Sequence, residues 1–326
     1  MRWVRIAAAC WGVLAVPLAA HAQSGAQSGF PSRSLTLVVP YSAGGVADVA
    51  ARLVADKLPE TLKQQVMIEN RPGAGSILAA RAVAGAAPDG HTMLWVGNNH
   101  AIGTALFKSL PFKILTDFLP ISTVSFFDLL IVTRTGSPLR TVGDIIKAAQ
   151  ASPGKLNVAT TPVGSTQNLG AELLKSVAKI DFKIVPFRTT PDQTTAVLRG
   201  DVDFSFDYYA STEGLISDKQ VHVIATTGPR RTSYLPDVPT VMESGLKDYE
   251  VVSWTGLAVP AGTPPDIVKL LNVAANQAVP VVEAKGTGKK LGLEMRASTP
   301  EAVNERMAAD IKKWSAVIEA AGIPKQ

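Results

Sequence analysis

The chain has a single cysteine, Cys10, among its 326 residues. It lies inside an N-terminal apolar run that we expect to be removed, so the remaining chain has none. A protein without cysteine has no disulfide framework, no thiolate nucleophile and no cysteine metal site. The four histidines are scattered and lack the H-E-x-x-H spacing. We therefore expect neither a zinc site nor any other metal or cofactor.

Charged residues are also few, at 18%, and aromatic residues make up only 6%. The formal net charge of +5 falls to +3 when Arg2 and Arg5 leave with the N-terminal run. Lysines and arginines do not cluster between aromatic residues, so the sequence gives no sign of a nucleic-acid-binding surface.

Signatures of catalysis are missing as well. The sequence has no G-x-S-x-G elbow for a hydrolase nucleophile. The stretch from Gly286 to Lys290 lacks the first glycine and the final Ser or Thr of a phosphate-binding loop. A periplasmic hydrolase is therefore the weaker alternative, and we expect a protein that is not an enzyme.

The N-terminus has the features of a secretory signal peptide. Two arginines precede an apolar run over residues 6–18, and Ala20-His21-Ala22 follows it. The run is too short, and its end too polar, for a membrane-spanning helix. We predict cleavage after Ala22, export to the periplasm as a soluble protein, and a disordered leader over residues 23–29.

The rest of the chain alternates between apolar β-branched runs and amphipathic stretches, the pattern of an α/β protein. Successive βα units predict doubly wound parallel sheets. We expect strands at 35–40, 66–70, 92–96, 118–124, 129–132, 156–160, 182–188, 201–207, 221–226 and 251–259, and helices at 46–58, 76–84, 142–151, 168–178, 192–199, 241–245, 264–279 and 301–321.

Roughly 300 residues remain after the signal peptide, more than one core readily accommodates, which suggests two domains. We assign residues 30–127 plus 250–326 to domain 1 and residues 128–249 to domain 2. Extended crossings near 125–132 and 248–256 would join them as a hinge. Ligands of such proteins lie in the interdomain cleft and are buried when the hinge closes.

Two strand–turn–helix units point to the chemistry of that cleft. The first N–H groups of a helix have no internal partner and carry partial positive charge, so a carboxylate docks there without a basic side chain. The alternative is that each turn only connects a strand to a helix. The candidate residues are Tyr41, Ser42, Ala43, Gly44 and Gly45 in the first turn and Gly164, Ser165, Thr166 and Gln167 in the second.

Five further polar residues are candidates. Asn98, Asn99 and His100 follow the third strand, at the edge where open α/β sheets bind ligands. Arg188 is the best cation for a second carboxylate because its guanidinium is bidentate, although it also fits a solvated strand end. Asp207 ends a strand near the cleft and would repel an anion unless the ligand carries a donor or the acid is protonated.

Four aromatic residues lie near the predicted turns or crossings: Tyr41, Phe127, Tyr208 and Trp254. They are suited to an aromatic or aliphatic ligand body. For Phe127 and Trp254, packing in a core is the equal alternative.

Six motifs resemble, in order, the signatures of the Bug-type substrate-binding proteins of tripartite tricarboxylate transporters. The resemblance covers essentially the whole chain after the signal peptide. The motifs are Val39–Asp48, Glu69–Gly75, Pro88–Thr92, Gly200–Asp203 with Phe206-Asp207, Leu235–Thr240 and Gly256–Pro264.

The resemblance implies a periplasmic Venus flytrap, expected to be a monomer, that captures a small mono- or dicarboxylate and delivers it to a membrane permease. In this family both turns typically grip a ligand carboxylate through backbone amides, hydroxyls and ordered waters, and an acid at the position of Asp207 reads a polar group in some members. A ligand-dependent partner of a membrane sensor kinase is the alternative, since it uses the same architecture. The chain departs from the family at Ser42-Ala43, where prolines are usual, and at Phe187-Arg188-Thr189, where Tyr-Lys/Arg-Gly is common.

The two turns give a first testable expectation. Bulky substitution at Gly45 or Gly164 should weaken ligand binding without unfolding the protein, because the side chain would occupy the space that the anion needs. Affinity of each variant for a bound carboxylate, measured by calorimetry, checks this. Unchanged affinity in both variants would contradict an anion site at the turns.

Overall fold

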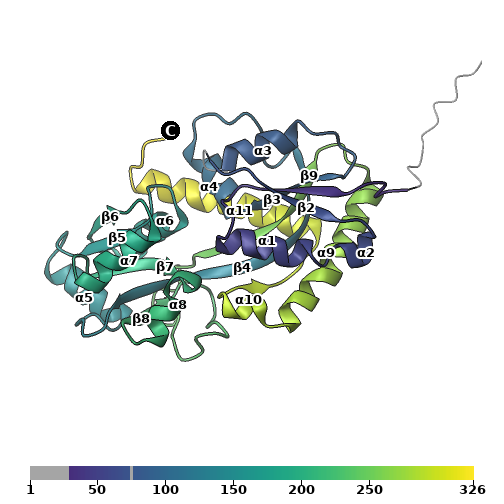
Figure 1. Ribbon diagram of the computed structural model, residues 1–326. Helices are drawn as coiled ribbons and strands as arrows, with labels where there is room; N and C mark the ends of the chain where they lie inside the picture. The colour runs from purple at the N-terminus through teal and green to yellow at the C-terminus, as the bar shows by residue number, and fades with distance from the viewer. Residues whose placement is uncertain (1–28, 74–75) are drawn as a thin grey trace, which may run out of the picture. The chain divides into compact units, whose positions relative to one another are not determined.

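Strands and helices alternate along the chain in a computed structural model that describes residues 29–73 and 76–326 (Figure 1). The predicted signal peptide, leader residues 23–28 and Ala74-Gly75 of the second motif lie outside these residues. The strands are β1 Leu35–Val39, β2 Val66–Asn70, β3 Thr92–Gly97, β4 Phe118–Arg134, β5 Asn157–Thr160, β6 Lys183–Pro186, β7 Phe204–Tyr208, β8 Val221–Thr226, β9 Val252–Pro260 and β10 Glu294–Met295.

The helices lie between these strands and at the C-terminal end of the chain. They are α1 Val46–Ala55, α2 Pro59–Leu62, α3 Ile77–Ala84, α4 Asn98–Leu106, α5 Val142–Ala151, α6 Thr166–Ala178, α7 Thr190–Arg199, α8 Tyr209–Ser217, α9 Pro265–Ala284, α10 Thr287–Lys290 and α11 Pro300–Ala320.

The strands form a continuous array in the order β2-β1-β3-β9-β4-β7-β5-β6, with β8 and β10 also paired to β4. Strands β1, β2 and β3 are parallel to one another, and β5 is parallel to β6 and β7. Strand β9 is antiparallel to β3 and β4, and β4 is antiparallel to β7. The predicted parallel βα units are therefore present, but antiparallel strands join them, so the arrangement is mixed.

The long strand β4 belongs to both parts of this array. It is one strand of 17 residues where the sequence predicted two. Residues up to Asp128 pair with β9, and from Leu129 onwards β4 pairs with β7 and β8. The change of partner thus takes place between two adjacent residues of β4, whereas β9 pairs, among the described strands, only with β3 and with the first half of β4.

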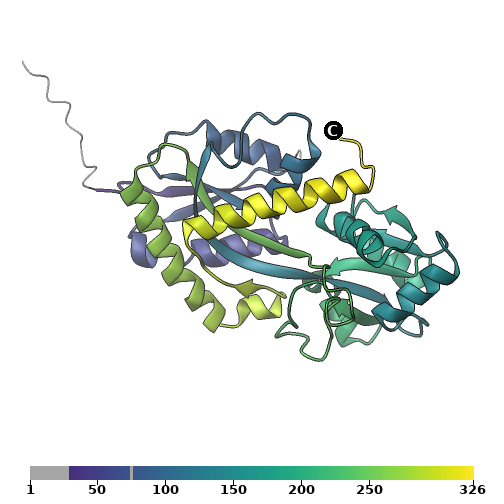
Figure 2. The same ribbon diagram turned by 180° about the vertical axis from the view of Figure 1, so that it is seen from behind.

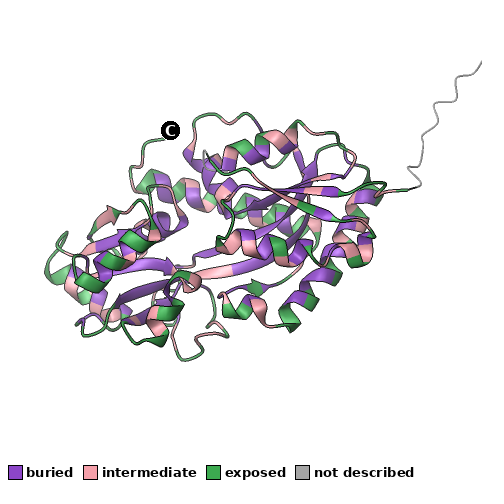
Figure 3. Cartoon of the chain, viewed as in Figure 1, coloured by how far each residue is buried: buried purple, intermediate pink, exposed green. Residues whose placement is uncertain are grey.

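Strands and helices differ in how far they are buried. Most strand residues are buried, whereas many helices turn an exposed face outwards (Figure 3). Helix α11 lies against α4, β4 and α6, so it contacts elements from both parts of the array (Figure 2). It buries Val303, Met307 and Trp314 in the core, as an apolar stripe at helical spacing predicts.

Two helices of nine residues each, α4 and α8, were not predicted. Helix α4 follows β3 without a connecting loop, and it is buried on nearly every side, so it shows no amphipathic stripe. Helix α8 buries only Thr212 and likewise has a weak apolar pattern. In both cases tertiary contacts, rather than periodicity, determine the helix.

Three shorter segments differ from the predictions. Residues 241–245 form turns instead of a helix, because Val241 donates its amide to the carbonyl of Thr226 at 2.9 Å and Thr240 pairs with the same residue. Helix α1 ends at Ala55, and the separate short helix α2 follows it. The stretch at 286–290, expected as a surface loop, contains the short helix α10.

Asp128 lies at the partner change in β4 and lines a cavity of about 360 Å³. Burial raises the pKa of its carboxyl to about 7, the negative charges of Glu294 and Glu250 add to the effect, and Arg230 and Arg306 oppose it. Between about pH 4 and pH 7, the Asp128 carboxyl is therefore protonated in the folded protein and ionised in the unfolded chain.

This difference predicts a pH-dependent stability. Since the folded state binds the extra proton, the contribution of Asp128 to the free energy of unfolding should decrease as pH rises from about 4 to about 7 and then level off. Asp128→Asn removes the charge, so its melting temperature should exceed that of the wild type above pH 7, and the gap should close towards pH 4. Asp201→Asn, at an exposed position, is the control. A constant gap across this range would refute the assignment.

Candidate functional site

The two predicted turns have nearly the same backbone geometry. Gly44 and Gly164 have φ of 86° and 82°, in the left-handed region that favours glycine. Each is followed by an extended N-cap residue, Gly45 at φ −72° and ψ 160° and Ser165 at φ −73° and ψ 161°. The strand–turn–helix units therefore form two matched helix starts.

The residue four positions after each left-handed glycine fixes its turn. The Gly44 amide donates to Asp48 Oδ2 at 2.8 Å, and the Gly164 amide donates to Asn168 Oδ1 at 3.1 Å. A carboxylate oxygen in the first turn and a side-chain amide oxygen in the second thus accept the same hydrogen bond from the glycine. Because the glycine amide is satisfied within the turn, the next N–H groups are the ones left at the helix start.

Asp48 is the centre of a buried network in the first turn. It accepts from Arg52 Nε at 2.9 Å and from Asn70 Nδ2 at 2.6 Å, and Asn70 also donates to the Tyr41 carbonyl at 2.9 Å. Although burial opposes it, the hydrogen bonds from Arg52, Asn70 and Gly44 hold the pKa of Asp48 below its usual range. Asp48 is therefore ionised at neutral pH, and its charge is neutralised by Arg52 and directed into the turn.

Hydroxyl groups complete the second turn. Ser165 Oγ accepts from the Asn168 amide at 3.1 Å and from Thr161 Oγ1 at 2.9 Å. The Ser165 carbonyl accepts from the Leu169 amide, the first helical hydrogen bond of α6. This leaves the start of α6, at Thr166 and Gln167, beside a large cavity.

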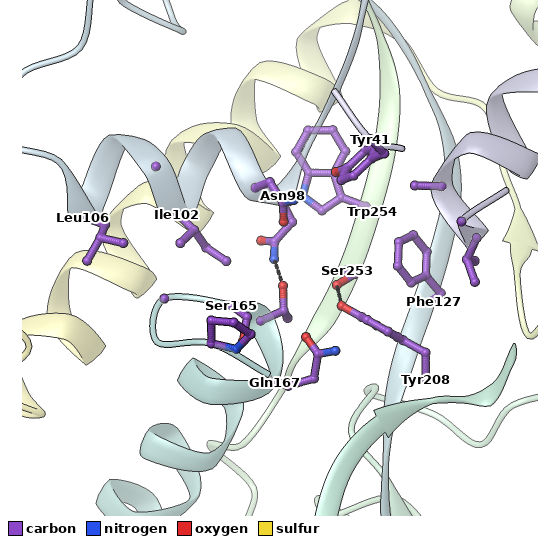
Figure 4. Close-up of a pocket in the computed structure, with 18 of the residues that line it drawn as sticks. Tyr41, Asn98, Ile102, Leu106, Phe127, Ser165, Gln167, Tyr208, Ser253 and Trp254 are labelled. Atoms are coloured by element: carbon purple, nitrogen blue, oxygen red, sulfur yellow. Dashed lines mark hydrogen bonds between the residues drawn. The ribbon is translucent and has the colours of Figure 1, made fainter. Parts of the chain in front are cut away.

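That cavity has a volume of about 790 Å³ and lies where several helices begin (Figure 4). The starts of α1, α4, α6, α7 and α8 all contribute lining residues. The lining consists of Tyr41, Gly45, Val46, Ala47, Asn98, Asn99, Ile102, Gly103, Leu106, Phe107, Phe127, Pro162, Val163, Gly164, Ser165, Thr166, Gln167, Thr190, Tyr208, Ser211, Ser253, Trp254 and Gln326.

No Asp, Glu, Lys, Arg or His occurs among the described residues of this lining. Helix N-termini supply partial positive charge, and each such end is equivalent to roughly half an elementary charge. The cavity therefore favours an anion and offers it hydrogen-bond donors, with no acidic side chain in its wall to oppose binding.

Hydrogen bonds connect residues of the cavity wall that come from elements far apart in the sequence. Asn98 Nδ2 donates to Thr166 Oγ1 at 3.0 Å, and Asn98 Oδ1 accepts from Trp314 Nε1 at 2.8 Å. Tyr208 and Ser253 share a hydroxyl hydrogen bond of 2.8 Å (Figure 4). Thr166 Oγ1 accepts from Asn98, and the Thr166 side chain is also hydrogen-bonded to Tyr208.

Aromatic rings form another part of the wall. Phe127 and Tyr208 pack edge to face with centroids 5.2 Å apart, and Tyr41 and Trp254 lie close by in Figure 4. Burial raises the pKa of both Tyr41 and Tyr208, so both phenols are neutral donors at physiological pH. Trp254 serves both expected roles, since it lines the cavity and is buried in the core.

The structure brings eight of the fourteen predicted site residues to the cavity. They are Tyr41, Gly45, Asn98, Asn99, Gly164, Ser165, Thr166 and Gln167. Ser42, Ala43, Gly44, His100, Arg188 and Asp207 do not line it.

Each of the three ionisable residues in the second group has a clear environment. His100 is buried, accepts from the Gly97 amide through Nδ1 at 3.2 Å, and burial lowers its pKa to about 4. Arg188 is exposed beyond β6. Burial raises the pKa of Asp207 to about 6, and it accepts from Ser211 Oγ at 2.7 Å. Asp207 therefore orients a hydroxyl of the lining without entering it.

Several lining residues were missed because α4 was not predicted. Ile102 and Leu106, which were not predicted, follow the predicted Asn98 at intervals of four residues and so share one helical face with it. That spacing was visible in the sequence. Ser253, Ser211, Thr190 and Gln326 carried no local signal, since only the folded chain brings them to the cavity.

Residues 29–73 and 76–326 lack two further features. None of their helices combines the length and apolar character needed to cross a membrane. No group of three or more His, Cys, Asp or Glu side chains is arranged there to hold a metal ion.

Comparison with known proteins gives a consistent result. The model of the tripartite tricarboxylate transporter family receptor matches residues 50–323, beginning just after the first turn. The structure of the periplasmic binding protein BugD is similar with TM-score 0.75 and 28% identity, covering 91% of this chain and 100% of BugD. The predicted α/β periplasmic-binding-protein fold is confirmed by this likeness.

Two similar structures contain carboxylates. Rpa4515 of R. palustris, solved with adipate, is similar with TM-score 0.78 and 29% identity. The match covers 90% of this chain and 99% of the Rpa4515 chain. MatC (Rpa3494) from Rhodopseudomonas palustris, solved with bound malate, is similar with TM-score 0.74 and 32% identity. The match covers 89% of this chain and 100% of the MatC chain.

The two glycines of the sequence-based prediction differ in the structure. A Cβ at Gly164 would require a left-handed conformation and would lie 2.6 Å from Leu106 Cδ2, whereas a Cβ at Gly45 has its nearest contact at 3.7 Å. Gly164→Ala should therefore lower the free energy of unfolding by about 1–2 kcal/mol, and Gly45→Ala should change it by less than about 0.5 kcal/mol. Chemical denaturation checks the pair, and equal losses would contradict the described turn.

Proposed function

Because the chain belongs to the tripartite tricarboxylate transporter receptor family, we propose that it captures a small organic acid, a mono- or dicarboxylate, and delivers it to a membrane permease. The family consists of solute-binding proteins, so the expectation of a binding protein rather than an enzyme is confirmed. The carboxylates in the two R. palustris structures support the ligand class.

The pair of matched turns at one cavity is the observation that carries the proposal. Both helix starts face a space whose described wall contains no charged side chain. A hydrogen bond to a charged group contributes roughly 1.5–3 kcal/mol. Two to four such bonds, less the cost of ordering the ligand, are sufficient for micromolar binding or better.

We assign roles as follows. The backbone N–H groups that follow Gly45 and Ser165 hold the carboxylate, and the hydroxyls of Thr166 and Tyr208 add side-chain donors. Gly45 and Gly164 keep the backbone accessible to the ligand. Asp48 and Asn168 position the turns without touching the ligand.

The same proposal includes hinge closure. We assign residues 30–127 with 250–326 to one domain and 128–249 to the other, joined by β4 and β9. The change of strand partners at Asp128 and Leu129 supports this boundary. Closing the hinge would tighten the contact between α4 and α6 around the ligand.

Export completes the proposed function. We propose that the signal peptide is cleaved after Ala22 and that the protein works in the periplasm as a monomer, where it meets a permease of the tripartite tricarboxylate type. Pull-down of that permease by the liganded protein, against pull-down of a periplasmic sensor domain, separates delivery from signalling.

A thermal-shift screen of the protein stripped of co-purified ligand tests the ligand class. Carboxylates should raise the melting temperature, because a ligand at a hundred times its dissociation constant stabilises the folded state by about 2.7 kcal/mol. Their methyl esters and amides should not, since these lack the negative charge that the helix starts attract. Equal shifts from acid and ester would exclude an anion site.

A further inference from the structure

The lining divides into chemically distinct regions along α4. Asn98 and Asn99 lie at the first turn of this helix, among the hydroxyl and amide groups of the cavity. Ile102 and Leu106 lie one and two turns further on the same face (Figure 4). At a rise of about 1.5 Å per residue, the face extends about 12 Å from the polar end to Leu106.

Apolar groups from the second turn continue this wall. Val163 and Pro162 line the cavity beside Gly164, and the site of a Gly164 Cβ is 2.6 Å from Leu106 Cδ2. Phe107 follows Leu106 in the lining. One end of the cavity is thus mainly a hydrocarbon surface made by two segments in contact, with Gln326 beside it, whose backbone amide donates to the Leu106 carbonyl at 3.0 Å.

Among the residues that the structure describes, no cationic side chain lines that end to pair with a second carboxylate. Arg188, the cation expected from the sequence, does not line the cavity. Arg52, at the first turn, is already bonded to Asp48 and Asn70. The far end also adjoins the C-terminal end of α4, where the helix dipole carries partial negative charge.

We propose that the natural ligand is a monocarboxylate with an apolar body, held by its one carboxylate at the helix starts and lying along Ile102 and Leu106. This inference rests on the proposed function and narrows its ligand class. Once the proposed hinge closure covers the ligand, a second carboxylate at the far end would be desolvated against hydrocarbon without a partner, which is costly. A methylene there instead gains about fourfold in affinity, or ~0.8 kcal/mol.

Calorimetry of the stripped protein with two matched series tests the proposal. The monoacids are butanoate, hexanoate and octanoate, and the diacids of equal carbon number are succinate, adipate and suberate. Affinity should rise about fourfold per methylene among the monoacids. Each monoacid should also bind at least about tenfold more tightly than the diacid of equal carbon number, because burying an unpaired charge costs more free energy than a tenfold change in affinity represents.

The outcomes separate this inference from the proposed function. Diacids that bind as tightly as the monoacids would overturn the apolar-body assignment while leaving carboxylate capture intact. Octanamide binding as tightly as octanoate would overturn both, since then the charge is not recognised.

A pair of variants locates the apolar end. Val163 lines the cavity and its side chain is half exposed, so the fold tolerates a longer residue there. Val163→Arg supplies the missing cation and should shift the ratio of suberate to octanoate affinity at least about tenfold towards suberate. Val163→Leu, the uncharged control, should keep the wild-type ratio. An unchanged ratio in the arginine variant would contradict the placement.

Discussion

The unpaired N–H groups at the start of a buried helix are the constraint on which this structure depends. They must find an acceptor, and here five helices begin at one cavity whose described wall offers them no acidic side chain. A left-handed glycine, an extended N-cap and a side chain four positions on recur in both main turns. The recurrence at Gly44 and Gly164 indicates that the turn geometry, rather than a particular side chain, is what the site requires.

Placing charge outside the cavity has a physical advantage. Asp48 is buried and ionised, but its carboxylate accepts hydrogen bonds from Arg52 and Asn70, and the guanidinium of Arg52 balances its negative charge. Asp207 is directed onto Ser211 and the Tyr208 amide rather than into the lining. In the proposed function, the head group of an anion is held mainly by backbone groups, which every sequence possesses, and the wall that contacts the ligand body selects between ligands.

Sequence patterns revealed the strand–turn–helix units well, because a period-two apolar run, a glycine turn and a helical stripe are local signals. Eight of the predicted site residues follow from them directly or from the strand end at Asn98. Helix α4 escaped detection because it is buried on nearly every side. Arg188 and Asp207 were chosen by their place at strand ends, but their surroundings depend on how α7 and α8 dock, and no local pattern encodes that docking.

The central claim is that backbone amides at the two turns hold the carboxylate. Amide proton shifts in ¹H–¹⁵N spectra of the assigned protein, titrated with octanoate, measure this most directly. The account predicts downfield shifts of the amides of Val46, Ala47, Thr166 and Gln167 that saturate together with binding, while the guanidinium signal of Arg188 stays unchanged. Binding that moves the Arg188 signal and leaves these four amides in place would contradict the account.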